Sequence, residues 1–130
     1  MTIVPLLVIE DEPAVMSFVR RALERGGYTV VGANSGTEAL ELLATEQFSG
    51  IISDMRTPGN VDGGGVYQWL KANRPELSKR IVFITGDIVN EDTVAILRET
   101  GAPCVEKPFR VQDLLATVEI TIGKAQREPV

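Results

Sequence analysis

The chain has 130 residues, with 18 acidic and 13 basic side chains, a formal net charge of −5 and no histidine. This length favours a single domain, and 44% hydrophobic with 24% charged residues is typical of a folded globular chain. The acidic excess argues against binding nucleic acid through its phosphates. The absent histidine excludes a histidine nucleophile, general base or metal ligand.

Cys104 is the only cysteine, which excludes an internal disulfide and a thiolate zinc site. The longest apolar stretches, such as Ile3 to Ile9, are far shorter than the roughly 20 residues that a membrane span needs. The N-terminus lacks the basic and then apolar pattern of a secretory signal. We therefore expect a cytoplasmic protein that does not contact a membrane.

Short apolar runs alternate with amphipathic segments, beginning at the N-terminus. The run Leu6 to Ile9 is continuous, as expected of a strand that is buried on both faces. A helix is predicted next, with Asp11 as its cap, Pro13 in its first turn and Gly26–Gly27 at its end. Its apolar residues recur at helical spacing; they are Val15, Phe18, Val19, Ala22 and Leu23.

The same alternation continues through the middle of the chain. Tyr28 to Ala33 predicts a second strand, and Ser35 to Glu38 has the capping-box pattern that begins a helix. Gly50 to Asp54 predicts a third strand. A loop rich in Gly, Pro and Asn is expected to run to Gly65, and the helix after it to end near Arg74, because a proline follows.

The last part of the chain predicts two more strands. Ile81 to Ile84 is a fourth buried run, a weaker helix follows Asn90, and Ala102 to Glu106 is a short fifth strand. Apolar residues from Val111 to Ile122 mark the final helix. Five repeats of strand and helix predict an α/β fold, a parallel sheet with helices on both faces. We expect one domain over residues 1–130, with a core of about 4–123, a frayed tail at 124–130 and no output domain.

Polar side chains stand where the predicted strands end. In an open parallel sheet, ligands bind beyond the carboxyl ends of the strands. Four of the five strands end there in a reactive or charged group, which the residues Glu10, Asp11, Asp54, Thr85 and Lys107 provide. Each alone could be a cap, a turn former or a solvated charge. Their shared place at one edge of one sheet points to a site.

Three carboxylates at one edge repel one another, by roughly 4 kcal/mol for two charges about 4 Å apart at an effective dielectric constant of about 20. One lysine cannot offset three acids. A hard divalent cation can, and a ligand set of carboxylates favours Mg²⁺, Mn²⁺ or Ca²⁺ over zinc. Next to a metal ion, Lys107 and the Thr85 hydroxyl, Asp54 is a candidate nucleophile toward phosphorus. The residues alone therefore predict a phosphoryl-accepting aspartate.

Taken together, these motifs resemble the receiver domain of two-component response regulators over essentially the whole chain. The segments that carry the resemblance are Val8–Pro13, Ile51–Gly59, Ile84–Gly86 and Glu106–Phe109. The resemblance implies a flavodoxin-like (βα)5 three-layer sandwich with strand order 2-1-3-4-5. The segments Arg74–Leu77 and Ile84–Asp87 are similar to those of receivers appended to hybrid histidine kinases.

The resemblance implies that Asp54 takes a phosphoryl group from the phosphohistidine of a histidine kinase or phosphotransfer protein. The chain is then a signalling phosphoacceptor in a phosphorelay, and any kinase activity lies on a parent polypeptide. Lys107 and Thr85 assist the transfer, and the Lys107–Pro108 bond is cis. Mg²⁺ is the implied ion, with Mn²⁺ as an alternative. Its implied ligands are Glu10, Asp11, Asp54 and the carbonyl oxygen of Arg56.

Several residues depart from the usual receiver pattern. Glu10 stands where many receivers have aspartate, Thr57 replaces a usual methionine, and the segment Asn60 to Gly63 is one residue longer. Cys104 stands where many receivers carry an aromatic side chain that moves with phosphorylation, so a switch built on Thr85 and an aromatic rotamer is not available in its usual form. The residues that we expect to modulate or switch the site are Arg56, Gly86, Asp87, Cys104 and Pro108.

Two other functions compete with this one. A pseudo-receiver would keep the fold as a protein-interaction module without being phosphorylated. A flavodoxin-like cofactor carrier would need a hydroxyl-rich phosphate loop after the first strand, where Glu10 to Glu12 would instead repel a flavin phosphate. The residues also leave open whether two copies pair through the face of the fifth strand.

Overall fold

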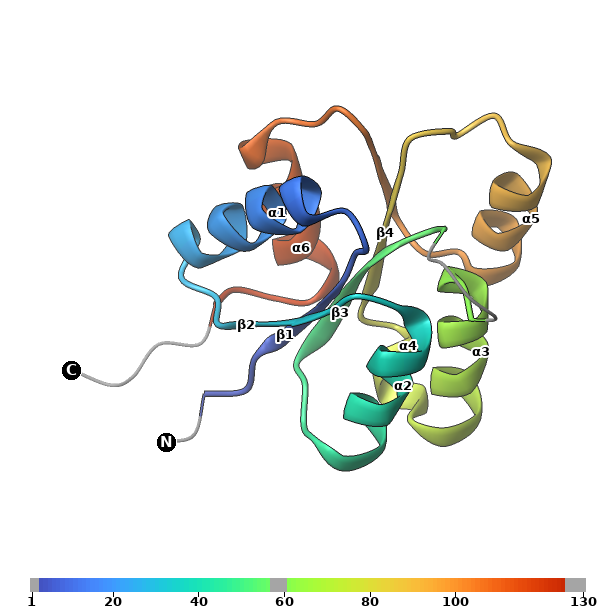
Figure 1. Cartoon of the computed structure of the whole chain (residues 1–130), viewed down its shortest axis with the longest axis horizontal. Helices are drawn as coiled ribbons and strands as arrows, with labels where there is room; N and C mark the ends of the chain where they lie inside the picture. Colours follow the sequence, from blue (N-terminus) through green and yellow to red (C-terminus); the bar gives the residue numbers. More distant parts are fainter. Residues whose placement is uncertain (1–2, 57–60, 126–130) are drawn as a thin grey trace.

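Five parallel strands form the centre of the fold, in the order β2-β1-β3-β4-β5 (Figure 1). The computed structural model describes residues 3–56 and 61–125. The strands are β1 (Leu6–Ile9), β2 (Val30–Ala33), β3 (Gly50–Asp54), β4 (Ile81–Thr85) and β5 (Cys104–Glu106). Both the parallel sheet and the strand order that the resemblance implies are confirmed.

The helices follow the strands in alternation. They are α1 (Pro13–Arg25), α2 (Gly36–Thr45), α3 (Gly63–Asn73), α4 (Pro75–Ser78), α5 (Glu91–Thr100) and α6 (Val111–Thr121). The short α4 was not predicted; it begins at the proline that ends α3, because proline is well suited to the first turn of a new helix. No helix of the described residues is long and apolar enough to cross a membrane.

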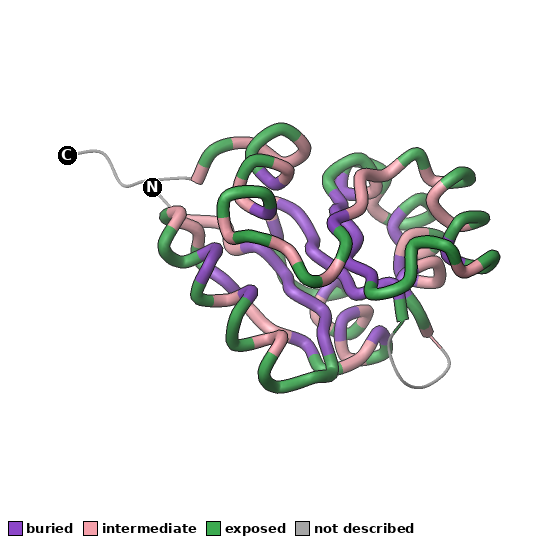
Figure 2. The backbone as a smooth tube through the Cα atoms, turned by 90° about the horizontal axis from the view of Figure 1, so that it is seen from above, coloured by how far each residue is buried: buried purple, intermediate pink, exposed green. Residues whose placement is uncertain are grey.

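The sheet divides the interior into two hydrophobic cores. Alternate residues of a strand point to opposite faces, so Leu6 and Val8 lie in one core and Leu7 and Ile9 in the other. Helices α1 and α6 cover the first core, and α2, α3, α4 and the half-buried side of α5 cover the second. Figure 2 shows the buried strands running between helices whose outer sides are exposed.

Two strands begin later than predicted. β2 begins at Val30, because the Tyr28 amide still donates to the Leu23 carbonyl at 3.0 Å and so belongs to the end of α1. β5 begins at Cys104 rather than Ala102, although the carbonyl of Pro103 already accepts a hydrogen bond from Phe83. Proline has no N–H to contribute to the ladder.

The prediction that Asp11 caps α1 is wrong. Glu12 is the residue at the N-cap, and its side chain makes no capping hydrogen bond. Asp11 instead lies with the carboxylates at the end of the sheet. The expected capping box of α2 is present, since the amide of Glu38 donates to Ser35 Oγ at 3.1 Å.

The three glycines before Val66 form the first turn of α3, where a loop was predicted. Asp62 caps this helix by accepting a hydrogen bond from the Gly65 amide at 2.8 Å. A Cβ atom at Gly63 would lie 3.0 Å from the Phe83 ring and 3.1 Å from the Asp54 carbonyl oxygen. Glycine therefore lets α3 begin directly against the end of β3. Of the unusual loop that precedes it, Thr57 to Asn60 lie outside the described residues.

Candidate functional site

The register of the sheet gathers the predicted polar residues at one edge. Ile9 is paired with Ser53, so Glu10 and Asp54, which follow them, leave adjacent strands at the same level. Thr85 is paired with Glu106, and the Lys107 amide donates to the Thr85 carbonyl at 2.8 Å. The structure thus brings together the carboxylates, Thr85 and Lys107, which the sequence places in four separate segments.

Lys107 is the centre of the polar contacts. Its ammonium donates to Asp54 Oδ2 at 2.8 Å and to Glu10 Oε1 at 3.0 Å. The other oxygen of Asp54, Oδ1, accepts the Arg56 amide at 2.9 Å. Each Asp54 oxygen therefore has a partner among the described residues, which fixes the plane of the carboxylate.

Three acidic side chains converge beside this lysine. Glu10, Asp11 and Asp54 each offer a carboxylate oxygen, and these atoms lie within 4.8 Å of one another. Glu10 and Asp54 are buried and Asp11 is exposed. With one lysine against three carboxylates, the cluster keeps a formal excess of negative charge. An all-oxygen set with one open side fits Mg²⁺, which retains several water ligands.

The burial of Glu10 is electrostatically costly. Burial, with a further contribution from Asp54, raises the pKa of Glu10 to about 7 despite the Lys107 ammonium. Burial also opposes the charge of Lys107, but its hydrogen bonds to Asp54 and Glu10 prevail and raise its pKa. A buried carboxyl group with a raised pKa, next to a second acid, is typical of a functional site, and here it fits one that binds a cation.

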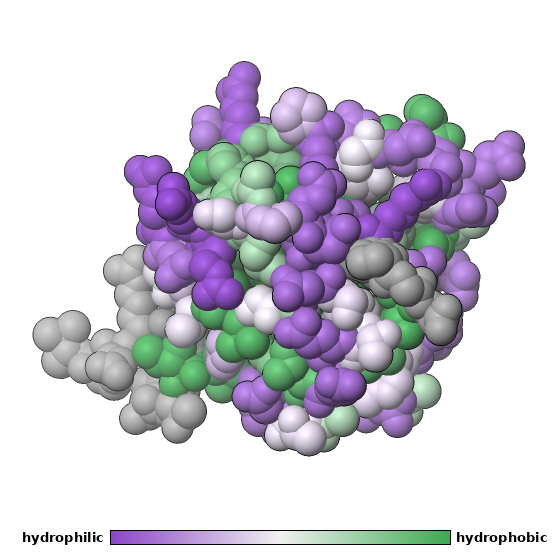
Figure 3. All heavy atoms as spheres, viewed as in Figure 1, coloured by the Kyte–Doolittle hydropathy of each residue, from purple (hydrophilic) through white to green (hydrophobic). Residues whose placement is uncertain are grey.

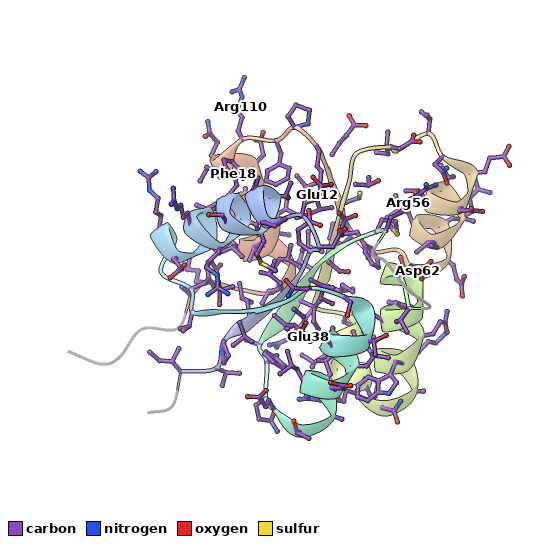
Figure 4. The ribbon with its side chains drawn as sticks, in the orientation of Figure 1. Glu12, Phe18, Glu38, Arg56, Asp62 and Arg110 are labelled. Atoms are coloured by element: carbon purple, nitrogen blue, oxygen red, sulfur yellow. The ribbon has the colours of Figure 1, made fainter. Side chains whose placement is uncertain are left out.

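A cavity of about 260 Å³ opens over Asp54 and Lys107. Thr85, Gly86 and Asp87 also line it, and the Asp87 amide donates to Thr85 Oγ1 at 3.1 Å. Arg56 lies on the wall as well. Glu12 also lines the cavity, although we did not predict it; Figure 4 shows Glu12 at the start of α1 and Arg56 beyond the end of β3.

Beside the cavity runs an apolar groove of about 560 Å³, which the sequence did not reveal. Its walls are Ala14, Val15, Phe18, Lys107, Pro108 and Phe109. The Lys107–Pro108 bond is cis, as the resemblance implies. Figure 3 shows apolar surface gathered above α1, bordered by polar side chains.

Phe18 lies on the apolar side of α1, but its ring faces the groove. It is 44% exposed and packs edge-to-face on Phe109, with the ring centroids 5.7 Å apart. Helical spacing identifies an apolar side of a helix, and here part of that side faces the groove instead of the core.

Cys104 is partly buried at the edge of the sheet, against the core that α2 and α3 cover. Burial, and to a lesser extent the charges of Glu106 and Asp54, raise the pKa of its thiol to about 11. A thiol of this kind stays protonated and behaves as a small apolar side chain. The structure contains no aromatic side chain at this position.

Comparisons with known proteins agree with the site. The chain is 33% identical over 125 residues to the response regulator MprA of Mycobacterium ulcerans, a match that covers 96% of this chain and 53% of that protein. The chain therefore spans about half the length of the curated relatives it matches.

Two solved structures show the same fold. A CheY-like receiver domain protein from Methanospirillum hungatei JF-1 superimposes with a TM-score of 0.82, at 22% identity, over 93% of this chain and 94% of that one. The receiver domain of a signal transduction histidine kinase from Syntrophus aciditrophicus gives 0.80 at 28% identity, over 91% of this chain and 89% of that one.

The family comparison covers most of the chain. Residues 6–119 match the response regulator receiver domain. This range contains every strand of the sheet and all three acids of the cluster, which fits a phosphoacceptor site. The chain belongs to the response regulator receiver domain family of two-component signalling.

Proposed function

We propose that Asp54 is the phosphorylated residue of this receiver domain and that a phosphohistidine on a partner protein is the donor. The observation that supports this most strongly is the paired contact of Asp54 with Lys107 and with the Arg56 amide, which leaves the carboxylate facing the cavity. An oxygen of Asp54 forms the new bond to phosphorus. The phosphorus–nitrogen bond of the donor breaks, and its electron pair returns to the imidazole.

Different side chains around Asp54 stabilise different oxygens of the transferred phosphoryl group. The Lys107 ammonium is placed to neutralise a phosphoryl oxygen, and the Thr85 hydroxyl, which lines the same cavity, can donate a hydrogen bond to another. Glu10, Asp11, Asp54 and the carbonyl of Arg56 would hold Mg²⁺. When bound, Mg²⁺ supplies positive charge for the oxygens that gain negative charge during the transfer.

Arg56 and Asp87 face the same cavity with opposite charges, each two residues beyond a site residue. We propose that they set the lifetime of the phosphoaspartate by controlling how water reaches it. Replacing either one by alanine should change the half-life of the phosphorylated chain severalfold, as followed by the decay of the phosphoryl mass. If both variants keep the wild-type half-life, neither residue has this role.

The donor protein is proposed to lie on the groove of Phe18, Pro108 and Phe109. Lys107 belongs to both the groove and the cavity, so a protein that brings a phosphohistidine to Asp54 meets the apolar rings at the same time. Aromatic side chains of this kind supply much of the binding energy of interfaces.

We also propose a setting for the domain. The likeness to the receiver domain of a histidine kinase supports, as one setting, a place within a hybrid kinase. A cytoplasmic location fits a partner that carries phosphohistidine, and the net charge of −5 fits a chain that makes no direct contact with nucleic acid.

The test of the phosphoacceptor role is mass spectrometry of the purified chain with acetyl phosphate and Mg²⁺. We expect one added phosphoryl group in the wild type and none in Asp54→Asn. Asp113→Asn, which changes an exposed acid on α6, serves as the control and should be modified like the wild type. A wild-type chain that stays unmodified with several small donors would support the pseudo-receiver alternative instead.

A further inference from the structure

Glu12 is the one charged residue of the described cavity wall to which the proposed transfer gives no role. It is the N-cap residue of α1, but its side chain makes no capping hydrogen bond. Among the described residues its carboxylate has no other hydrogen-bond or ion-pair partner either. An exposed carboxylate without a structural task therefore lies at the cavity that Asp54 and Lys107 share.

The direction of attack decides which part of a donor meets Glu12. During phosphoryl transfer the attacking oxygen, the phosphorus and the leaving atom lie roughly in line. Asp54 supplies the attacking oxygen and is buried, with 8% of its surface exposed, so the leaving group departs toward solvent. The lining residues on the exposed part of the wall are Glu12, Arg56, Gly86 and Asp87.

This exposed part of the wall carries an excess of negative charge. Glu12 and Asp87 each contribute a carboxylate, and Arg56 alone contributes a positive charge. A leaving group that carries positive charge is therefore attracted to the wall, whereas one that becomes an anion is repelled. The wall can distinguish donors by the charge of the group that leaves.

Phosphoryl donors differ in this charge. A protonated phosphohistidine carries positive charge on its ring, and the ring N–H can donate a hydrogen bond. When its phosphorus–nitrogen bond breaks, the electron pair returns to the nitrogen and the ring leaves as neutral imidazole, so part of the positive charge is still present in the transition state. In acetyl phosphate a phosphorus–oxygen bond breaks instead, the pair stays on the oxygen, and acetate leaves as an anion.

Glu12 also lies next to the groove on which we place the donor protein. Ala14, two residues further along α1, lines that groove. In the view of Figure 4, Glu12 lies between Phe18 of the groove and Arg56 of the cavity. A histidine ring that reaches Asp54 from the groove therefore passes the Glu12 carboxylate.

We propose that Glu12 selects phosphoryl donors whose leaving atom is a protonated nitrogen heterocycle. Its carboxylate pairs with the cationic ring of the donor and disfavours donors whose leaving group is an anion. The inference rests on the proposed function and deepens it, because it names a residue that distinguishes a phosphohistidine from an acyl phosphate. It assigns Glu12 to the donor and not to the metal ion.

The test compares phosphoimidazole with acetyl phosphate as donors to the purified chain, with Mg²⁺ at neutral pH, by mass spectrometry. Neither donor carries a protein that could lie on the groove, so the ratio of their second-order rate constants depends on the leaving group. We expect the ratio of phosphoimidazole to acetyl phosphate to fall about fivefold in Glu12→Gln and further in Glu12→Lys. High ionic strength should reduce the difference between the wild type and both variants.

Glu24→Gln is the matched control, because Glu24 is exposed near the other end of α1 and its replacement removes the same charge. It should keep the wild-type ratio. The rise in melting temperature with Mg²⁺ should be the same in Glu12→Gln and the wild type, which separates donor selection from metal binding.

Three results overturn the inference while leaving the phosphoacceptor role intact. They are an unchanged ratio in Glu12→Gln, an equal fall in Glu24→Gln, and a Glu12→Gln variant that no longer responds to Mg²⁺. A wild-type chain that neither donor phosphorylates overturns the inference and contradicts the proposed function as well, so the two failures are distinct.

Discussion

Lys107 Nζ lies 2.8 Å from Asp54 Oδ2, although 53 positions separate the two residues in the chain. Two strand registers produce this contact. β3 and β4 align Asp54 with Ile84, and β4 and β5 align Thr85 with Glu106, the residue before Lys107. The contact therefore forms only when β3, β4 and β5 are paired in the correct register. The same contact stabilises the edge of the sheet and positions the groups of the site.

Replacing Lys107 by methionine should lower both the stability of the fold and the rate of phosphorylation. The substitution keeps the apolar stem but leaves Glu10 and Asp54 without their ammonium. We expect the free energy of unfolding in metal-free buffer to fall by about 2–4 kcal/mol, slightly less than for a fully buried pair, because a fifth of the Lys107 side chain is exposed. Phosphorylation by acetyl phosphate should slow about a hundredfold.

Urea unfolding and mass spectrometry measure these two effects. Lys71→Met, at an exposed position of α3, is the control and should change neither. Equal stability of Lys107→Met and the wild type would mean that the ammonium only offsets its own desolvation.

Magnesium should stabilise the folded chain. At ten times its dissociation constant, an ion that binds only the folded state adds about 1.4 kcal/mol to the free energy of unfolding. Asp11→Asn should abolish this gain at little cost to the fold, because Asp11 is exposed. Melting curves with and without Mg²⁺ provide the measurement, with Asp113→Asn again as the control. An equal shift in both variants would place the ion elsewhere.

The groove beside the cavity should matter only for a protein donor. Phe18→Ala removes one wall of the groove and the ring contact with Phe109. We expect transfer from a phosphohistidine protein to slow about tenfold or more, while phosphorylation by acetyl phosphate keeps its rate. Ile120→Ala, at an exposed position on α6, should affect neither reaction. A parallel loss with both donors would instead indicate damage to the site.

Cys104 should react slowly with alkylating reagents. Its raised pKa of about 11, against an ordinary 9.0, leaves about a hundredfold less thiolate at pH 8, and the thiolate is the reactive form. The rate of iodoacetamide labelling should still increase above pH 9 in the folded chain. Labelling in urea should restore the ordinary rate; a folded chain that reacts as fast as the unfolded one would contradict the prediction.

The same shift affects stability at high pH. The unfolded thiol ionises near pH 9 and the folded one near pH 11, so the folded state loses stability as the pH rises between these values. Cys104→Ser should remove this part of the pH dependence, which equilibrium unfolding at a series of pH values would measure.

Much of the site could be predicted because strand ends are marked in the sequence. Continuous apolar runs such as Leu6 to Ile9 predict buried parallel strands, and in such a sheet the residues after the runs meet at one edge. Glu10, Asp54 and Lys107 could be grouped by this argument without knowing any distance.

What could not be predicted depends on tertiary contacts. Apolar spacing groups Phe18 with the other apolar residues of α1, but only the position of Phe109 decides that its ring faces a groove. The glycines at 63 to 65 favoured a loop, whereas the Asp62 cap and the tight contact with Phe83 make them a helix. The buried hydroxyl of Thr93 on α5, which has no hydrogen-bond partner among the described residues, likewise has no signature in the sequence, because threonine is compatible with either side of a helix.

The division of the interior into two cores has a consequence for how such a domain can diverge. The groove borders the core that α1 and α6 cover, whereas α5 packs against the core that α2 and α3 cover. The sheet keeps these apolar side chains from touching across its plane. Substitutions that change the groove and substitutions that change the packing of α5 can therefore accumulate independently of one another. Only the polar residues at the strand ends lie next to both cores, so a substitution there affects both sides of the sheet.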